Sequence, residues 1–221
     1  MTIRAVLFDI DGTLIDSNDA HIRAWAEAFL SVGARFSDQA IHDQIGKGAD
    51  GLIPALMPGA SQAQQEALSR AQGDVFKSRY LKQVQPFSGA RDLLARVHQA
   101  GQRIVLASSA SKAELDYYVG LLGAREMVDD VTTADDVEQT KPAPDIPATA
   151  LRKVAPLPAS EVIMVGDTPY DAEAAAKCGI ATVAVRSGKF SDQALRQAGA
   201  VAIYDDVASL LAGYSASPLA Q

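Results

Sequence analysis

Short, unbroken runs of apolar residues recur along the chain, and most of them end at a polar residue. They occupy residues 5–8, 104–107, 162–165 and 181–185, and a further run at 201–204 adds an edge strand. Runs of this length without polar alternation are typical of strands that are buried on both faces of a parallel sheet.

Helical patterns lie between these runs. Residues 90–100 place Leu93, Leu94 and Val97 on one stripe, and residues 171–178 are rich in alanine. The alternation of strand and helix predicts an α/β fold, with a doubly wound, Rossmann-like parallel sheet as its core.

One long segment breaks this alternation. Residues 16–85 contain no convincing strand, but Ile22, Trp25 and Phe29 recur at helical spacing there. We expect an inserted α-helical cap domain at 16–85, with a catalytic core made of 1–15 and 86–221.

Composition limits the partners of this chain. Hydrophobic residues make up 48% and charged residues 21% of 221, and the net charge is −7. No broad basic face is available for nucleic acid or an anionic membrane, so we expect neither as a partner.

The single cysteine, Cys178, excludes an intrachain disulfide and is expected in the core. We see no signal peptide and no stretch of about 20 apolar residues, so a cytoplasmic location is expected.

Polar side chains follow three of the predicted strands. Asp9 and Asp11 stand two residues apart after the first strand, Ser108 follows the second and Asp167 the third. Ligands of open α/β sheets bind beyond the carboxyl ends of the strands, so these side chains are expected to converge there. Taken singly, each has a plainer interpretation: an Asp-Gly turn with solvated acids, or a helix cap.

Together these segments resemble the motifs of the haloacid dehalogenase superfamily. Residues 9–14 resemble the first motif, Ser108 the second, Lys141 in 141–145 the third, and 166–171 the acidic fourth. The motifs occur in the family's order over most of the chain. An insertion directly after the first motif is similar to the C1-type α-helical cap of the phosphoglycolate phosphatase and β-phosphoglucomutase-like branch.

The resemblance implies a role for each acid. Asp9 would be the nucleophile, and Asp11 the general acid and base, with a raised pKa. Asp9 and Asp167 would bind Mg²⁺ through their carboxylates and Asp11 through its backbone carbonyl, while Asp171 would support the metal from outside its direct ligands.

The resemblance also implies the groups that bind substrate. Ser108, Ser109 and Lys141 would hold the phosphoryl oxygens. His21 would couple cap closure to Asp11, although a half-buried helix residue is the alternative. Lys47 would reach a second anionic group of the substrate, and the alternative there is a solvated loop lysine.

The expectation is therefore a Mg²⁺-dependent phosphatase that acts on a small phosphorylated metabolite, such as a sugar phosphate or phosphoglycolate. A phosphosugar mutase and a non-catalytic binding protein of the same fold stay as alternatives, whereas Asp11 argues against a dehalogenase. The sequence leaves the oligomeric state open, a monomer included.

Overall fold

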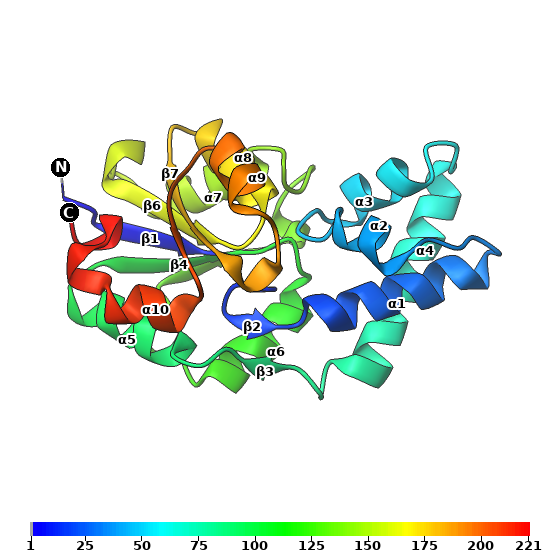
Figure 1. Ribbon diagram of the computed structural model, residues 1–221, viewed down its shortest axis with the longest axis horizontal. Coiled ribbons are helices and arrows are strands. Elements are labelled where there is room, and N and C mark those ends of the chain that lie inside the picture. Colours follow the sequence, from blue (N-terminus) through cyan, green and yellow to red (C-terminus); the bar gives the residue numbers. More distant parts are fainter. Residues whose placement is uncertain (1) are drawn as a thin grey trace.

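The computed structural model describes residues 2–221, which form a six-stranded parallel sheet with an all-helical lobe at one end (Figure 1). In spatial order the strands are β5 (Asp130–Thr132), β4 (Arg103–Ala107), β1 (Ala5–Phe8), β6 (Val162–Gly166), β7 (Ala181–Val185) and β8 (Ala200–Tyr204). The order reverses next to β1, which pairs in parallel with both β4 and β6. This topological switch point is where α/β sheets bind their ligands.

The central strands consist of apolar residues because helices cover both faces of the sheet. All four residues of β1 are fully buried, with alternate side chains entering different hydrophobic clusters. One face is covered by α5 (Ala90–Gln99), α6 (Lys112–Leu122) and α10 (Val207–Ala212). The other face is covered by α7 (Asp145–Lys153) and α8 (Pro169–Ala176), while α9 (Asp192–Gln197) connects β7 to β8.

The helical lobe is formed by residues 18–80, which lie between β1 and α5 in the chain. Its helices are α1 (Asn18–Ser31), α2 (Asp38–His42), α3 (Ala49–Leu56) and α4 (Gln62–Val75), and α4 continues into a π-helical turn at Phe76–Tyr80. A separate hydrophobic cluster fills this lobe, with Trp25, Phe29 and Leu52 among its members. Local sequence favours α4, because Ser61 and Gln64 form a capping box at its start.

The lobe joins the sheet through two adjacent chain segments. β2 (Ile15–Asp16), which leads into the lobe, pairs antiparallel with β3 (Gln85–Pro86), which leads out of it. The entry and exit therefore form a short two-stranded ribbon, an arrangement suited to a hinge.

The predicted fold class is confirmed, and so are the five sheet strands that the apolar runs indicated. The sequence did not indicate β5, which has only three residues, or the ribbon of β2 and β3. The helix expected at 171–178 begins earlier, at Pro169, because Thr168 caps it. Within residues 2–221, the structure contains no helix whose length and apolar character would suffice to cross a membrane.

Candidate active site

Two carboxylates stand at the ends of neighbouring central strands. Asp9 follows β1 and Asp167 follows β6, and both are almost completely buried. The Oγ1 hydroxyl of Thr13 donates to Asp167 Oδ1 at 3.0 Å and to Asp9 Oδ2 at 3.3 Å. The first-motif loop therefore fixes the two acids relative to each other.

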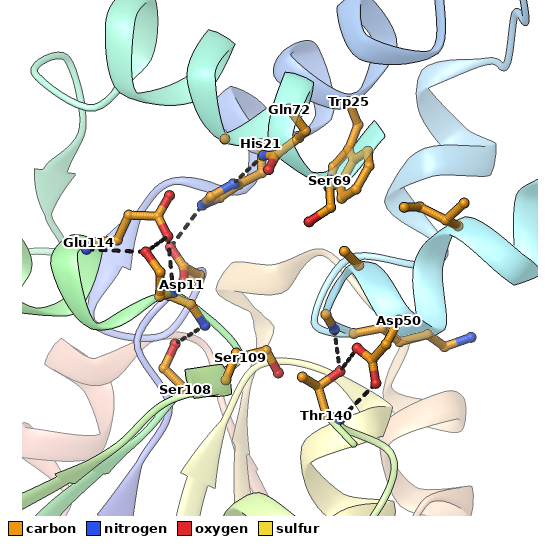
Figure 2. Close-up of a pocket in the computed structure, with 18 of the residues that line it drawn as sticks. Asp11, His21, Trp25, Asp50, Ser69, Gln72, Ser108, Ser109, Glu114 and Thr140 are labelled. Atoms are coloured by element: carbon orange, nitrogen blue, oxygen red, sulfur yellow. Dashed lines mark hydrogen bonds and ion pairs between the residues drawn. The ribbon is translucent and has the colours of Figure 1, made fainter. Parts of the chain in front are cut away.

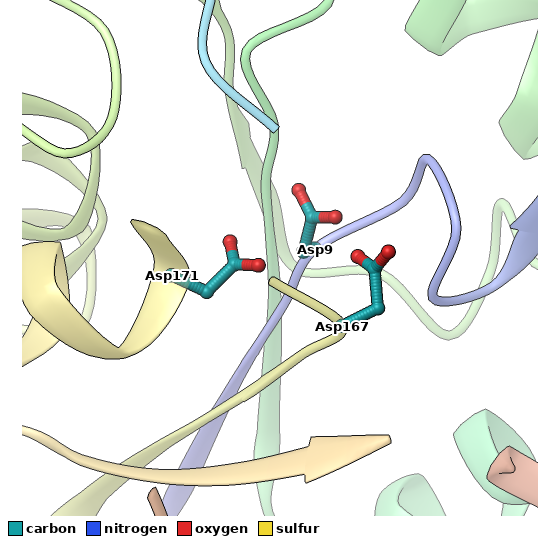
Figure 3. A group of neighbouring side chains, drawn as sticks. All are labelled: Asp9, Asp167 and Asp171. Atoms are coloured by element: carbon teal, nitrogen blue, oxygen red, sulfur yellow. The ribbon is translucent and has the colours of Figure 1, made fainter. Parts of the chain in front are cut away.

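A third carboxylate and a lysine complete this buried group. Asp171 lies in the first turn of α8, where its Oδ2 accepts from the Thr168 backbone N–H and hydroxyl. Lys141 Nζ donates to Asp9 Oδ1 at 2.5 Å and to Asp171 Oδ1 at 2.6 Å. Residues that are far apart in the sequence thus meet in one buried cluster (Figure 3).

The charge of this cluster is unbalanced. Three carboxylates face one ammonium group, and burial, with the charges of Asp171 and Asp11, raises the pKa of Asp9 to about 7 against the opposing effect of Lys141. Burial and the charges of Asp9 and Asp171 likewise raise the pKa of Asp167 well above its ordinary value. Although burial opposes it, the charges of Asp171 and Asp9 raise the pKa of Lys141, which stays protonated.

The donor set fits a divalent cation. Oxygen atoms of Asp9, Asp167 and Asp171 lie within 4.8 Å of one another, and hard oxygen ligands suit Mg²⁺. Beside them, Asn18 donates from Nδ2 to Asp167 Oδ2 at 3.0 Å, while its buried Oδ1 has no partner. A buried acceptor without a donor is costly, and a metal-bound water would supply one.

Ser108 and Ser109 stand beside this cluster, after β4. Ser108 is buried, and its Oγ accepts from the Ala110 backbone N–H at 3.0 Å. Both serines line the same cavity as Asp9 and Asp11 (Figure 2). The two serines therefore lie at the same cavity as Asp9, which Lys141 contacts without lining the cavity itself.

Asp11 points away from the three-carboxylate cluster. Its Oδ1 accepts from Ser17 Oγ at 2.6 Å and lies 3.1 Å from His21 Nε2. Although burial opposes it, the charge and hydrogen bond of His21 hold the pKa of Asp11 below its ordinary value. The expectation of a raised pKa is wrong for this conformation, because a cap residue ion-pairs with the carboxylate.

His21 is held by cap residues on its other sides. Its ring stacks on Phe76 at 3.9 Å between centroids, and Gln72 Nε2 lies 3.3 Å from Nδ1. Despite burial, the charge of Asp11 raises the pKa of His21. The structure thus places His21 in direct contact with Asp11, while its role in coupling closure to Asp11 stays a prediction.

The cavity between the sheet and the helical lobe, the expected cap, has a volume of about 730 Å³. Figure 2 shows Trp25, Ser69 and Gln72 on its cap side, facing Ser108 and Ser109. Lys47 also lines it, but its Nζ donates to Gln44 Oε1 at 2.6 Å and lies 4.5 Å from the centroid of the Tyr170 ring. Burial lowers the pKa of Lys47.

Sequence reasoning missed two residues of this site. Thr13 lies inside the first motif and joins Asp9 to Asp167, and Asn18 contacts Asp167 from the first residue of α1. A buried polar residue at the start of a helix, such as Asn18, indicates a functional role, but its burial is known only from the fold.

Comparison with known proteins gives concordant matches. The family model for haloacid dehalogenase-like hydrolases matches residues 6–185. The chain is 28% identical over 94% of its length to a phosphoglycolate phosphatase of Rhodospirillum rubrum, covering 89% of that protein. It is also 28% identical to the chloroplastic protein Suppressor of quenching 1 of Arabidopsis thaliana, of which it spans 20%. A hydrolase structure from Pseudomonas syringae aligns with a TM-score of 0.90 and 27% identity, over 97% of this chain and 98% of that one.

Proposed function

The chain belongs to the haloacid dehalogenase-like hydrolase family, and from that premise we propose that it is a cytoplasmic, Mg²⁺-dependent phosphatase of a small phosphorylated metabolite. The observation that carries the proposal is the bridge that Lys141 makes between Asp9, which lines the cavity, and Asp171. A buried ammonium group beside a strand-end carboxylate provides a nucleophile together with a cation for phosphoryl oxygens.

In the first step Asp9 attacks phosphorus. A carboxylate oxygen of Asp9 forms a bond to phosphorus while the bond from phosphorus to the ester oxygen breaks, giving an aspartyl phosphate. The departing oxygen takes a proton from Asp11 and leaves as an alcohol. Lys141, Ser108 and Ser109 hold the phosphoryl oxygens during this transfer.

In the second step water resolves the aspartyl phosphate. Asp11, now ionised, takes a proton from a water molecule whose oxygen attacks phosphorus. The bond between phosphorus and Asp9 breaks, inorganic phosphate leaves, and both carboxyl groups return to their starting states. Asp11 must turn from His21 toward the cavity and carry a proton before the first step.

The metal site of this proposal uses Asp9, Asp167 and the Asp11 backbone carbonyl, with Asp171 supporting it. Mg²⁺ offsets the repulsion between these carboxylates and an anionic phosphate when it is bound. The unpartnered Oδ1 of Asn18 and the raised pKa of Asp167 support a cation at this position.

Residues 16–85 serve in this proposal as a cap that closes over the core made of 1–15 and 86–221. A closed cap excludes water and positions the leaving group. Lys47 and His21 are its proposed contributions to substrate choice and to the placement of Asp11. A sugar phosphate and phosphoglycolate both fit within the cavity of about 730 Å³.

The test is phosphate release from a panel of phosphorylated metabolites, with and without Mg²⁺. We expect Asp9→Asn to lower kcat at least 10⁴-fold, on the order of the loss of a catalytic nucleophile, while the far-ultraviolet spectrum stays unchanged. Asp19→Asn is the control, since this exposed acid pairs with Lys189 on the surface. Near-normal turnover in Asp9→Asn would contradict the assignment of the nucleophile.

A further inference from the structure

The cap segment 43–50 touches the core beside its motif residues. Ser109, the neighbour of Ser108, donates from Oγ to the Gly46 carbonyl at 3.3 Å. Tyr170, the neighbour of Asp171, donates its hydroxyl to a backbone carbonyl of the same cap segment. The segment therefore contacts core residues that adjoin the motif side chains in the sequence.

The densest of these contacts joins Asp50 to Thr140. The Thr140 backbone N–H donates to Asp50 Oδ2 at 2.9 Å, and its hydroxyl donates to Asp50 Oδ1 at 2.5 Å (Figure 2). The Thr140 Oγ1 atom also accepts from the Gly48 backbone N–H at 2.8 Å. Three hydrogen bonds thus connect the start of α3 to one core residue.

The contact leaves no spare room. A Cβ atom on Gly48 would lie 2.5 Å from Thr140 Oγ1 and 2.7 Å from Asp50 Oδ1. The absence of a side chain at position 48 lets the two backbones come close enough for this geometry.

Thr140 directly precedes Lys141 in the sequence, so Asp50 holds the backbone N–H and the side chain of the residue next to the lysine. A hydrogen bond to the Thr140 N–H, and one to its side chain, restrict the rotation of the backbone at this position. Lys141 must reach Asp9 and Asp171 at once, and such a bridge depends on where its Cα is placed. The cap thereby contacts the lysine through its neighbour, without entering the buried cluster.

We propose that Asp50 is a positioning residue that aligns Lys141 through Thr140, so that the cap completes the phosphate site when it closes. This inference rests on the proposed phosphatase function and adds a residue to it. The contact is made within the protein, so its effect falls on the phosphoryl group and is independent of the leaving group.

Two alternative roles for Asp50, a contact with the leaving group and a purely structural contact, predict different experimental results. Asp50 also lines the cavity, so a direct contact with the leaving group would change the preference among substrates. A purely structural contact would lower the melting temperature and leave phosphate binding unchanged.

The test compares Asp50→Ala, Thr140→Val and the double variant with the wild type. The dissociation constant of inorganic phosphate is measured by calorimetry with Mg²⁺ present, which needs no turnover. We expect each single variant to weaken phosphate binding about tenfold, the effect of losing one or two charge-assisted hydrogen bonds. The double variant should lose clearly less than the product of the two single losses, because both changes break the hydrogen bond from the Thr140 hydroxyl to Asp50.

Thr140→Ser keeps the hydroxyl and should bind phosphate like the wild type, and Asp38→Ala removes an exposed acid elsewhere in the cap. The ratio of kcat/KM between the best metabolite and p-nitrophenyl phosphate should stay unchanged in Asp50→Ala. Wild-type phosphate affinity in both single variants, additive effects in the double variant, or a changed substrate ratio would each overturn the inference. Failure of the wild type to release phosphate from any ester would instead contradict the proposed function.

Discussion

His21 Nε2, on the first cap helix, lies 3.1 Å from Asp11 Oδ1, on the loop after the first strand. The contact favours the ionised form of Asp11 in the present conformation, because burial raises its pKa but the charge and hydrogen bond of His21, together with the hydrogen bond from Ser17, lower it by more. The proposed role of general acid requires a protonated Asp11, so in that proposal Asp11 leaves this ion pair before the first step. The position of the cap therefore affects the protonation of Asp11 as well as its orientation.

The ion pair predicts a stability window in pH. The pKa of Asp11 is lowered from 3.8, so its contribution is present above pH 3.8 and is lost as the pH falls through the lowered value. The pKa of His21 is raised from 6.5, so its contribution is full below pH 6.5 and is lost as the pH rises through the raised value. His21→Gln should therefore lower the free energy of unfolding most between pH 3.8 and pH 6.5, by about 2 kcal/mol.

Thermal melts of the wild type and His21→Gln from pH 3 to 9 check this window, with His98→Gln as the control. His98 lies exposed in the last turn of α5. A loss of melting temperature in His21→Gln that is the same at every pH would show that stacking on Phe76, and not the charge, is what the histidine supplies.

Mg²⁺ should stabilise the protein more at high pH than at low pH. The pKa of Asp9 is raised from 3.8 to about 7 in the folded protein without metal, so the stability of that form falls as the pH rises across this interval. A bound cation would offset both the burial of the Asp9 carboxylate and its repulsion from the neighbouring acids, which cause this fall. We expect saturating Mg²⁺ to raise the melting temperature by about 5–10 °C at pH 8, and by less than half of that at pH 5.5.

The control for the metal experiment is NaCl at matched ionic strength, which screens charges without binding in the cluster. Asp167→Asn removes one proposed ligand and should abolish most of the Mg²⁺ effect. An equal rise in melting temperature at both pH values would contradict a site made of carboxylates with raised pKa values.

Lys47→Met should test substrate choice separately from chemistry. The Lys47 side chain lines the cavity, and its ammonium group is held by Gln44 and the ring of Tyr170. If it also contacts a second anionic group of the substrate, KM for the best metabolite should rise about tenfold, the loss of one charge-assisted hydrogen bond. KM for p-nitrophenyl phosphate should stay within about twofold, and so should both values in the exposed control Lys82→Met. Equal changes of KM for both substrates would show that Lys47 does not contribute to substrate choice.

The convergence of the buried cluster was predictable from sequence. Apolar runs of four or five residues identify the central strands, and parallel strands place Asp9 and Asp167 at the same edge of the sheet. The resemblance to known motifs then pointed to Lys141 and Asp171, which the structure joins to Asp9.

The contacts between cap and core were predictable only in part: the resemblance placed His21 near Asp11, but it indicated neither their ion pair nor the contact of Asp50 with Thr140. The ion pair of His21 with Asp11 and the contact of Asp50 with Thr140 depend on how the cap is placed over the sheet. That placement follows from the hinge ribbon and from long-range packing, and neither has a local sequence pattern. The pKa of Asp11 was mispredicted for this reason.

Gly12→Ala should disrupt the proposed metal site through a steric clash that Gly33→Ala does not cause. Both glycines have left-handed backbone angles, with φ of +76° and +78°, so both substitutions incur a conformational cost of about 1–2 kcal/mol. A Cβ on Gly12 would lie 2.1 Å from Asp167 Oδ2 and 2.2 Å from Asn18 Nδ2, whereas a Cβ on Gly33 would meet no atom within 4 Å. The alanine at position 12 must therefore displace the Asp167 carboxylate. We expect Gly33→Ala to keep full activity and Mg²⁺ affinity, and Gly12→Ala to lose at least tenfold in Mg²⁺ affinity by calorimetry, on the order of one disturbed metal contact. Equal Mg²⁺ affinities in the two variants would show that Asp167 does not bind the metal.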